Sequence, residues 1–232
     1  MSSTAKLALI KQTILSSVML VIMLIIFCVS AGSFRIKRLW LFAAIAFIYF
    51  LGSNITLYKL NPELLIQRLK IRRKGSKTWD EILVRASILS AMILVPAVSG
   101  LDIGRYQWSS LGFSCVYVDI ILLIVSSVLI NWAMIVNPFF EPTVRIQNEQ
   151  EHRVISPGPY AYVRHTGYLS GIMWITSIPL ILGSLYGLLP VAFYTTLMII
   201  RTYLEDETLK EELAGYIEYS KRVRHRLFPY IW

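Results

Sequence analysis

The sequence predicts an all-α, polytopic helical membrane protein. Of its 232 residues, 56% are hydrophobic and only 16% are charged, whereas a soluble domain carries about 25% charged residues. The uncharged residues also form long runs, and a helix of about 20 residues crosses the hydrocarbon core of a bilayer. These two observations predict about six membrane helices, including a tight C-terminal hairpin, followed by a cytosolic C-terminal helix.

Four apolar runs come first and are expected to span the bilayer. They cover residues 13–34, Leu39–Tyr58, about Ile82–Leu101, and a stretch within Gly112–Val136. The first run lacks a small-residue cleavage site, so we expect a retained span rather than a signal peptide. Pro96 is expected to kink the third span. The chain then divides into N-terminal spans, residues 1–136, and a C-terminal region, residues 137–232, that carries the polar motifs.

The uncharged run from Thr166 to Ile200 is too long for one span. As a single helix it would extend about 52 Å, against a hydrocarbon core of about 30 Å. Gly183 and Ser184 stand at its middle. We therefore expect two short helices joined by a tight turn, an arrangement that brings the segments before Thr166 and after Ile200 to one membrane face.

Basic residues indicate the orientation of the chain. The segment 59–79 holds the densest basic run, which the positive-inside rule places in the cytoplasm. Its cations are Arg68, Lys70, Arg72, Arg73, Lys74 and Lys77. Counting spans from there puts both termini and residues 137–166 on the same side, while Arg35, Lys37 and Arg38 face outward against the rule. The net charge of +9 is expected to set topology and to contact membrane lipids, rather than to bind nucleic acid.

The sequence offers no pattern typical of a metal site. Cys28 and Cys115 lie in separate apolar segments with no CxxC spacing. The histidines are His152, His165 and His225, and none of them stands four residues from another. Neither a disulfide framework nor a metal-dependent mechanism is predicted. Asp119, the one acid in the fourth span, is expected to have a structural role.

Two polar clusters flank the predicted hairpin, and each has an ordinary alternative. Residues 158–168 combine a Gly-Pro turn, three tyrosines and an Arg-His pair, although tyrosines also form interfacial belts and a histidine often caps a helix. Arg201 directly follows thirty-five uncharged residues and stands four before Glu205. That spacing allows a simple surface ion pair, but a charge at a membrane boundary is more often functional.

Several short motifs follow one another in a recognisable order between about Val144 and Trp232. They are Gln147-Asn-Glu149, Gly158-Pro-Tyr160, Arg164-His165, Gly167-Tyr168, Arg201, Glu205-Asp206, Gly215-Tyr216, Tyr219, Arg226-Leu-Phe-Pro229 and Trp232. In order and spacing this region resembles the isoprenylcysteine carboxyl methyltransferase family of integral-membrane enzymes that use S-adenosylmethionine. One departure is Thr166, where the family usually has proline, and the N-terminal spans show no comparable motif.

The resemblance implies a cytosolic-side pocket for S-adenosylmethionine and a lipid or prenylated small molecule as substrate. The residues it places against the cofactor are Gln147, His152, Arg153, Val154, Ile155, Tyr160, His165, Thr166, Gly167, Tyr168 and Glu205. It also implies catalytic roles for three residues. Arg201 would orient an acceptor carboxylate through a bidentate contact, and Glu205 would hold Arg201 or a cofactor hydroxyl. An amine or thiol acceptor would need His165 or Glu205 as a base.

The family name implies carboxyl O-methylation of a prenylcysteine-type acceptor, and the sequence leaves alternatives. A sterol-type membrane reductase using NADPH has a similar C-terminal helical arrangement, but the spacing of the motifs argues against it. A phospholipid N-methyltransferase would differ mainly in its acceptor. A non-enzymatic transporter or scaffold is a further alternative; a transporter would place its polar groups near the bilayer midplane, often in symmetric halves, whereas here the clusters lie at one boundary and the halves are unlike.

Overall fold

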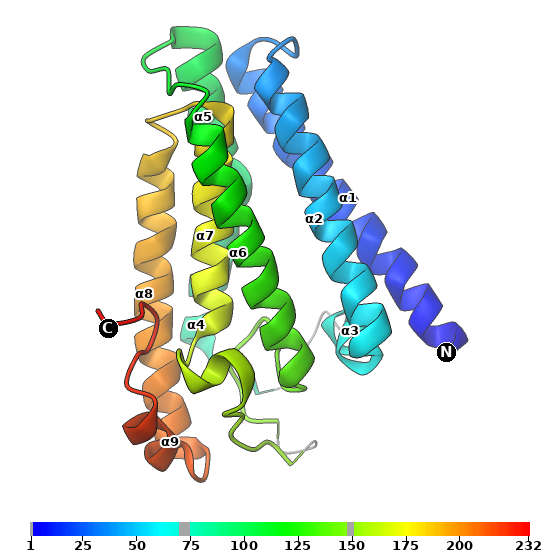
Figure 1. The fold of residues 1–232 in the computed structure, drawn as a ribbon, viewed down its shortest axis with the longest axis vertical. Coiled ribbons are helices and arrows are strands. Elements are labelled where there is room, and N and C mark those ends of the chain that lie inside the picture. The colour runs from blue at the N-terminus through cyan, green and yellow to red at the C-terminus, as the bar shows by residue number, and fades with distance from the viewer. Residues whose placement is uncertain (1, 70–74, 148–150) are drawn as a thin grey trace.

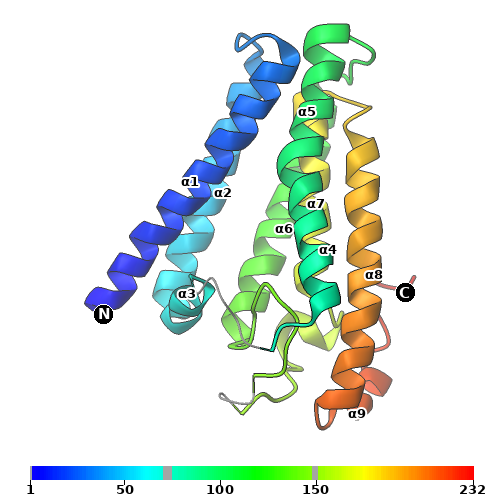
Figure 2. The same cartoon turned by 180° about the vertical axis from the view of Figure 1, so that it is seen from behind.

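The computed structural model describes residues 2–69, 75–147 and 151–232, and within these ranges it is all-helical (Figures 1 and 2). Helices account for 74% of the residues and no strand is present in the described parts. Four helical segments are long and apolar enough to cross a membrane: Ser3–Ala31, Lys37–Leu60, Thr78–Tyr106 and Cys115–Val136. The polytopic all-α prediction is therefore confirmed. Lys70, Arg72, Arg73, Lys74, Asn148 and Glu149 lie outside the described residues.

The first two spans are α1 (Ser3–Ala31) and α2 (Lys37–Leu60). Helix α1 begins well before residue 13, where the prediction started it, because Ser2 caps it by accepting a hydrogen bond from Ala5 N at 3.2 Å. A short helix, α3 (Pro62–Arg68), follows. Asn61 accepts a bond from Leu64 N and donates to Met134 O at 2.9 Å, which fixes α3 against the end of α6 (Cys115–Val136).

The third span is one continuous helical segment with two wide turns. It consists of α4 (Thr78–Leu89), the π-helical η1 (Ser90–Leu94), α5 (Val95–Gly100) and the π-helical η2 (Leu101–Tyr106). The predicted disturbance at Pro96 takes the form of the π turn that precedes it, since proline lacks the N–H that a regular helix needs. Gly104 allows close packing, because a Cβ there would lie 2.3 Å from that of Ala31 in α1.

The C-terminal half contains the predicted hairpin. After α6 (Cys115–Val136) and the 3-10 turn η4 (Gly158–Ala161), the chain forms α7 (Thr166–Leu182), α8 (Leu188–Glu212) and α9 (Tyr216–Arg222). The turn lies where it was predicted, at Gly183, whose φ is 88°. The prediction of two short helices was wrong for α8, which continues past Ile200 as a charged, helix-favouring segment.

The hairpin turn is fastened by a buried acid of the third span. Asp102 in η2 is fully buried, and its carboxylate accepts hydrogen bonds from the Ser184 hydroxyl at 2.6 Å and from Tyr186 N at 3.2 Å. It also accepts bonds from the backbone and hydroxyl of Ser109, at 2.8 Å and 2.6 Å. One carboxylate therefore ties the α7–α8 turn to the end of the third span.

The connections gather at two ends of the bundle (Figures 1 and 2). The N-terminus, α3, η4 and α9 lie at one end, while segments 32–36, 107–114 and 183–187 lie at the other. The predicted grouping of loops is thus present. At the second end, Arg105 donates to Val29 O at the end of α1, and the Arg38 guanidinium lies 5.3 Å from the Phe113 ring centre. Structural contacts of this kind explain cations at the end where the positive-inside rule expects few.

Candidate active site

Tyr160 is positioned by the tight turn η4. Gly158 has a φ of +66°, and a Cβ there would lie 2.8 Å from Trp132 Nε1, so glycine is required at this position. The Tyr160 hydroxyl accepts a hydrogen bond from Asn137 Nδ2 at 3.1 Å, and its carbonyl accepts one from the Tyr219 hydroxyl at 2.7 Å. Burial raises the pKa of Tyr160. The hydroxyl therefore stays protonated and can donate a hydrogen bond to a ligand.

The segment that leads into α7 is paired with the C-terminal tail. Arg164 N donates to His225 O at 3.0 Å, and His165 N donates to Arg226 O at 2.9 Å. These two backbone bonds hold the turn at Arg164 and His165 against the tail. As a result, the Arg164 and His165 side chains project from a fixed stretch of backbone toward α8.

Thr166 is the first residue of α7. Proline is favoured at this position because the backbone N–H that it lacks would form no hydrogen bond within the helix. Its hydroxyl donates to Val163 O at 2.9 Å. This side-chain bond fastens the turn that a proline ring would stiffen, so Thr166 preserves the local geometry by another means.

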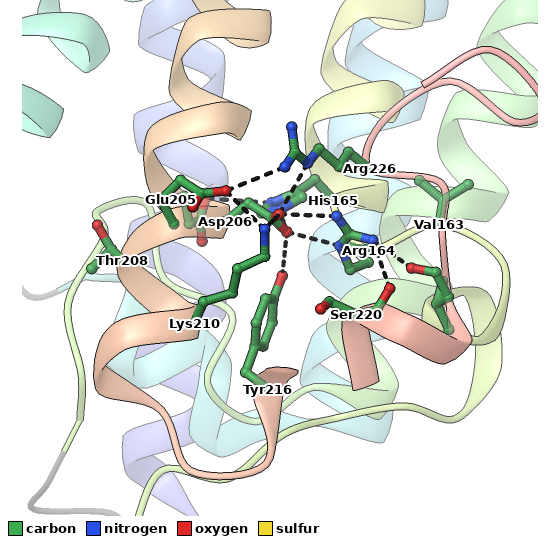
Figure 3. Close-up of polar contacts among 12 residues, drawn as sticks. Val163, Arg164, His165, Glu205, Asp206, Thr208, Lys210, Tyr216, Ser220 and Arg226 are labelled. Atoms are coloured by element: carbon green, nitrogen blue, oxygen red, sulfur yellow. Dashed lines mark hydrogen bonds and ion pairs between the residues drawn. The ribbon is translucent and has the colours of Figure 1, made fainter. Parts of the chain in front are cut away.

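Asp206 is the centre of the polar cluster (Figure 3). It is fully buried in α8 and has partners from four directions. They are Arg164 Nε and Nη2 at 2.8 and 2.9 Å, the Tyr216 hydroxyl at 2.9 Å, Arg226 Nε at 3.0 Å, Lys210 Nζ at 3.2 Å and His165 Nε2 at 3.4 Å. Burial alone would raise the pKa of Asp206, but the bonds to His165 and Arg164 outweigh it and lower that pKa strongly. Asp206 is therefore a carboxylate that joins α7, α8, α9 and the tail.

His165 lies between two carboxylates. Its Nε2 faces Asp206, and its Nδ1 lies 3.6 Å from Glu205 Oε2. Burial would lower the pKa of His165, but the two acids outweigh it and raise that pKa. The sequence left His165 open as a proton acceptor; the structure favours a ring that already holds its proton. His165 thus donates to Asp206 and places its positive charge beside Glu205.

Glu205 is held as an anion at the same place. Tyr168 donates its hydroxyl to Glu205 Oε2, and the His165 and Tyr168 rings stack with centres 5.7 Å apart. Burial favours the neutral acid, yet the His165 bond and the charge of Arg201 lower the pKa of Glu205. No described residue forms a hydrogen bond with Oε1 of Glu205, so this oxygen is available to a ligand hydroxyl or amine.

Arg201 has a different partner from the one its spacing suggested. The four-residue spacing allowed an ion pair with Glu205, but the guanidinium pairs with Asp80 of α4, with Nε 2.6 Å from Oδ1 and Nη2 3.2 Å from Oδ2. Nη2 also donates to Pro142 O at 2.5 Å. The guanidinium carbon lies 4.7 Å from the Tyr168 ring centre. Because Asp80 occupies the Nε–Nη2 edge, the expected bidentate contact with an acceptor cannot use that edge.

One cavity at this end of the bundle brings the predicted cofactor residues together. Its lining includes all eleven of them: Gln147, His152, Arg153, Val154, Ile155, Tyr160, His165, Thr166, Gly167, Tyr168 and Glu205. Gly167 admits the Phe140 ring, since a Cβ there would lie 2.6 Å from Phe140 Cζ. Arg201 does not line the cavity; it lies behind Tyr168. Asp119 is also remote from it, fully buried near the start of α6 at the other end of the bundle.

Comparison with known proteins adds the reaction class to this geometry. Residues 119–211 match the sequence profile of the isoprenylcysteine carboxyl methyltransferase (ICMT) family. Over this region the chain is similar to the ICMT family. Members are membrane methyltransferases that use S-adenosylmethionine, so the chain is assigned to the membrane methyltransferases. No curated protein matches the chain. The match begins before the resemblance noted from Val144 and ends before α9.

The cavity has the chemistry that S-adenosylmethionine requires of an ICMT-type site. The cofactor carries hydroxyl, amino and adenine groups that need acceptors, a carboxylate that needs donors, and a cationic sulfonium. Gln147 is 2% exposed, and its Oε1 has no hydrogen-bond partner among the described residues. A buried amide oxygen of this kind is costly unless a ligand completes its bonds. With Glu205 Oε1 as a second acceptor and the Tyr160 hydroxyl as a donor, the residues fit the cofactor.

Sequence reasoning missed the residues that support the site. Asp80 was not considered for a role, and Arg164, Asp206, Tyr216 and Arg226 served only as pieces of the family pattern. The adjacency of Arg164 to His165 and of Asp206 to Glu205 was the available signal for part of this cluster. For Asp80 there was none, because α4 lies in the third span, outside the family match.

Proposed function

We propose that this cavity binds S-adenosylmethionine and that the protein transfers its methyl group to the carboxylate of a prenylcysteine-type lipid. The proposal rests on the convergence of the eleven predicted cofactor residues on one cavity, in which the buried Gln147 Oε1 has no hydrogen-bond partner among the described residues. The family match gives no support to the sterol-type reductase or the phospholipid N-methyltransferase.

The proposed cofactor contacts follow from the available atoms. Gln147 Oε1 and Glu205 Oε1 would accept hydrogen bonds from the cofactor, and Tyr160 would donate one. The segment His152 to Ile155 and the start of α7 close the cavity around the ligand. When bound, the cofactor supplies an electrophilic methyl group on a sulfonium. The chain's own residues need only bind it, keep water away and align the acceptor.

Arg201 is proposed to orient the acceptor carboxylate. No described residue forms a hydrogen bond with its Nη1, while Asp80 and Pro142 O fix the rest of the guanidinium. One charge-assisted hydrogen bond from Nη1 would hold the carboxylate at the membrane boundary, where the apolar part of α8 ends. A carboxylate is already ionised at neutral pH, so transfer to it needs no general base. Alignment of this kind supplies about 7–11 kcal/mol of barrier reduction in favourable cases.

The site is proposed to face the cytoplasm. The cavity lies at the end of the bundle that holds the N-terminus, α3 and α9, and α3 is part of the basic segment 59–79. The positive-inside rule places such a segment in the cytoplasm. A lipid substrate would then bind with its tail in the bilayer and its polar end at the cavity.

Calorimetry on the detergent-purified protein tests the cofactor, and a radiolabelled methyl assay tests the acceptor. We expect S-adenosylmethionine to bind, binding to weaken in Gln147→Ala, and label to pass to a farnesylated N-acetylcysteine. As a control, Arg35→Ala at the opposite end should bind like the wild type. Absence of binding would refute the cofactor assignment. Binding with label passing to phosphatidylethanolamine instead would keep the cofactor and replace the acceptor.

A further inference from the structure

A second cavity lies on the other side of the Asp206 cluster. Its lining includes five basic side chains, and no acidic side chain of the described residues lines it. The basic residues are Arg164, Lys210, Arg224, His225 and Arg226. Arg164 lines both cavities, so the Arg164–Asp206 pair forms part of the wall between them. We call this second cavity the basic groove; it is distinct from the cofactor cavity.

The groove carries more positive charge than its neighbours neutralise. Arg164, Arg226 and Lys210 all contact Asp206, and Lys210 and Arg226 also contact Glu207. Arg224 is exposed and forms no ion pair or hydrogen bond with any described residue. Four permanently charged basic side chains thus face two acidic side chains, which leaves the groove attractive to an anion.

The position of the groove indicates which anion it meets. The Arg226 guanidinium lies 5.5 Å from the ring centre of Tyr203 and 5.3 Å from that of Trp232. Tyr203 follows Arg201 by two residues, about 3 Å along the helix axis, so one rim of the groove lies where the apolar part of α8 ends. Tyrosine and tryptophan are enriched at this headgroup level of a membrane.

Two apolar side chains beside the cations are left almost fully open. Tyr230 is 93% exposed and Ile231 is 84% exposed, and both line the groove. Exposed aromatic and aliphatic groups next to arginines are typical of segments that lie in the interfacial layer of a bilayer. A soluble anion would use the cations alone and would leave these apolar groups in water.

From these observations we propose that the basic groove binds the phosphate headgroup of an anionic phospholipid. Arg224 is the cation that meets the phosphate directly, while Tyr230 and Ile231 insert beside the lipid's glycerol and upper acyl region. The proposal does not depend on the methyltransferase function, because lipid binding can be measured without cofactor or acceptor.

Native mass spectrometry of the detergent-purified full chain tests the proposal. The probes are phosphatidylglycerol and phosphatidylcholine, titrated separately, with inorganic phosphate as a competitor. We expect the wild type to retain phosphatidylglycerol in preference to phosphatidylcholine. Arg224→Gln should weaken that binding by about fivefold, the factor expected for one cation at an anionic surface. Tyr230→Ala should also weaken it, since it removes the apolar part of the contact.

Arg222→Gln is the matched control. Arg222 is exposed two residues away, at the end of α9, and does not line the groove, so its loss should leave binding within about twofold if a defined site exists. Equal loss in the Arg222 and Arg224 variants would show diffuse attraction and overturn the proposal. So would equal retention of the two lipids. Displacement of the lipid by equimolar inorganic phosphate would show a site for soluble anions instead.

Discussion

Asp80 and Arg201 form a buried ion pair across 121 positions of the sequence, with Arg201 Nε 2.6 Å from Asp80 Oδ1. The other carboxylate oxygen accepts a hydrogen bond from Val144 N at 2.8 Å. Asp80 therefore joins α4, α8 and the segment that leads to the cofactor cavity. The third span, which carries none of the family's motifs, becomes in this way a support of the candidate active site.

We expect Asp80→Asn to abolish most turnover while leaving cofactor affinity nearly unchanged, because Asp80 fixes Arg201 but does not line the cavity. Asp80→Ala should in addition destabilise the protein by about 3–5 kcal/mol, the usual cost of leaving one partner of a buried ion pair alone. Calorimetry, methyl-transfer rates and thermal unfolding separate these effects. Glu81→Gln, a change at the neighbouring exposed acid, is the control. Loss of cofactor affinity equal to the loss of turnover would contradict this role for Asp80.

Glu205→Gln and Tyr160→Phe should weaken S-adenosylmethionine binding, since each removes a group that the cavity offers to the ligand. The expected loss is about 1–3 kcal/mol for each, the range for a buried hydrogen bond left unmade. Arg201→Lys should retain the affinity and lose turnover; lysine is preferred to alanine here because it keeps a charge beside Asp80. Isothermal titration of the three variants measures the split. An equal loss of cofactor affinity in all three variants would show that Arg201 does not have a role separate from cofactor binding.

Gly167→Ala should weaken cofactor binding through Phe140 rather than directly. The added Cβ would meet the Phe140 ring at 2.6 Å and push it into the cavity that both residues line. Phe140→Leu in the same chain should restore much of the affinity, because the smaller side chain vacates that space. A double-mutant cycle on the dissociation constant measures the coupling. Additive effects of the two changes would exclude this explanation.

His165 should make the stability of the protein depend on pH. Its pKa is raised in the folded state above the ordinary value of about 6.5. The stabilisation is therefore complete below that value and is lost as the pH rises through the folded pKa. The difference in unfolding temperature between the wild type and His165→Gln should be largest near about pH 6 and shrink above it. A difference that grows with rising pH would show that His165 is neutral when folded.

Thr166→Pro should be tolerated. Proline suits the first position of α7, and the substitution loses only the hydroxyl bond to Val163 O. We expect cofactor affinity within about threefold of the wild type, equivalent to less than about 0.7 kcal/mol. Leu169→Pro, placed in the helix proper, is the contrasting variant and should unfold the start of α7. Loss of binding in Thr166→Pro would mean that the threonine has a direct role toward the ligand.

The membrane architecture could be predicted from sequence because it depends on local properties. Apolar run length gives the spans, and Gly183 in an overlong run gives the hairpin. The extent of α8 was not predicted from run length, because the uncharged run ends at Ile200 while the helix continues through charged, helix-favouring residues to Glu212. The lining of the cavity followed from the family pattern. The ion pair of Arg201 did not, because its partner is set by how α4 packs against α8 and not by any spacing along the chain.

The two polar clusters are attached to opposite arms of one hairpin, and the register of those arms is set at its turn. Asp102 grips that turn at the far end of the bundle, on the other side of the membrane from the candidate active site in the proposed orientation. A one-residue slip there would displace His165 relative to Glu205 by about 1.5 Å. A substitution at the hairpin turn can therefore disturb the candidate active site at the opposite face of the bilayer, a full membrane thickness away.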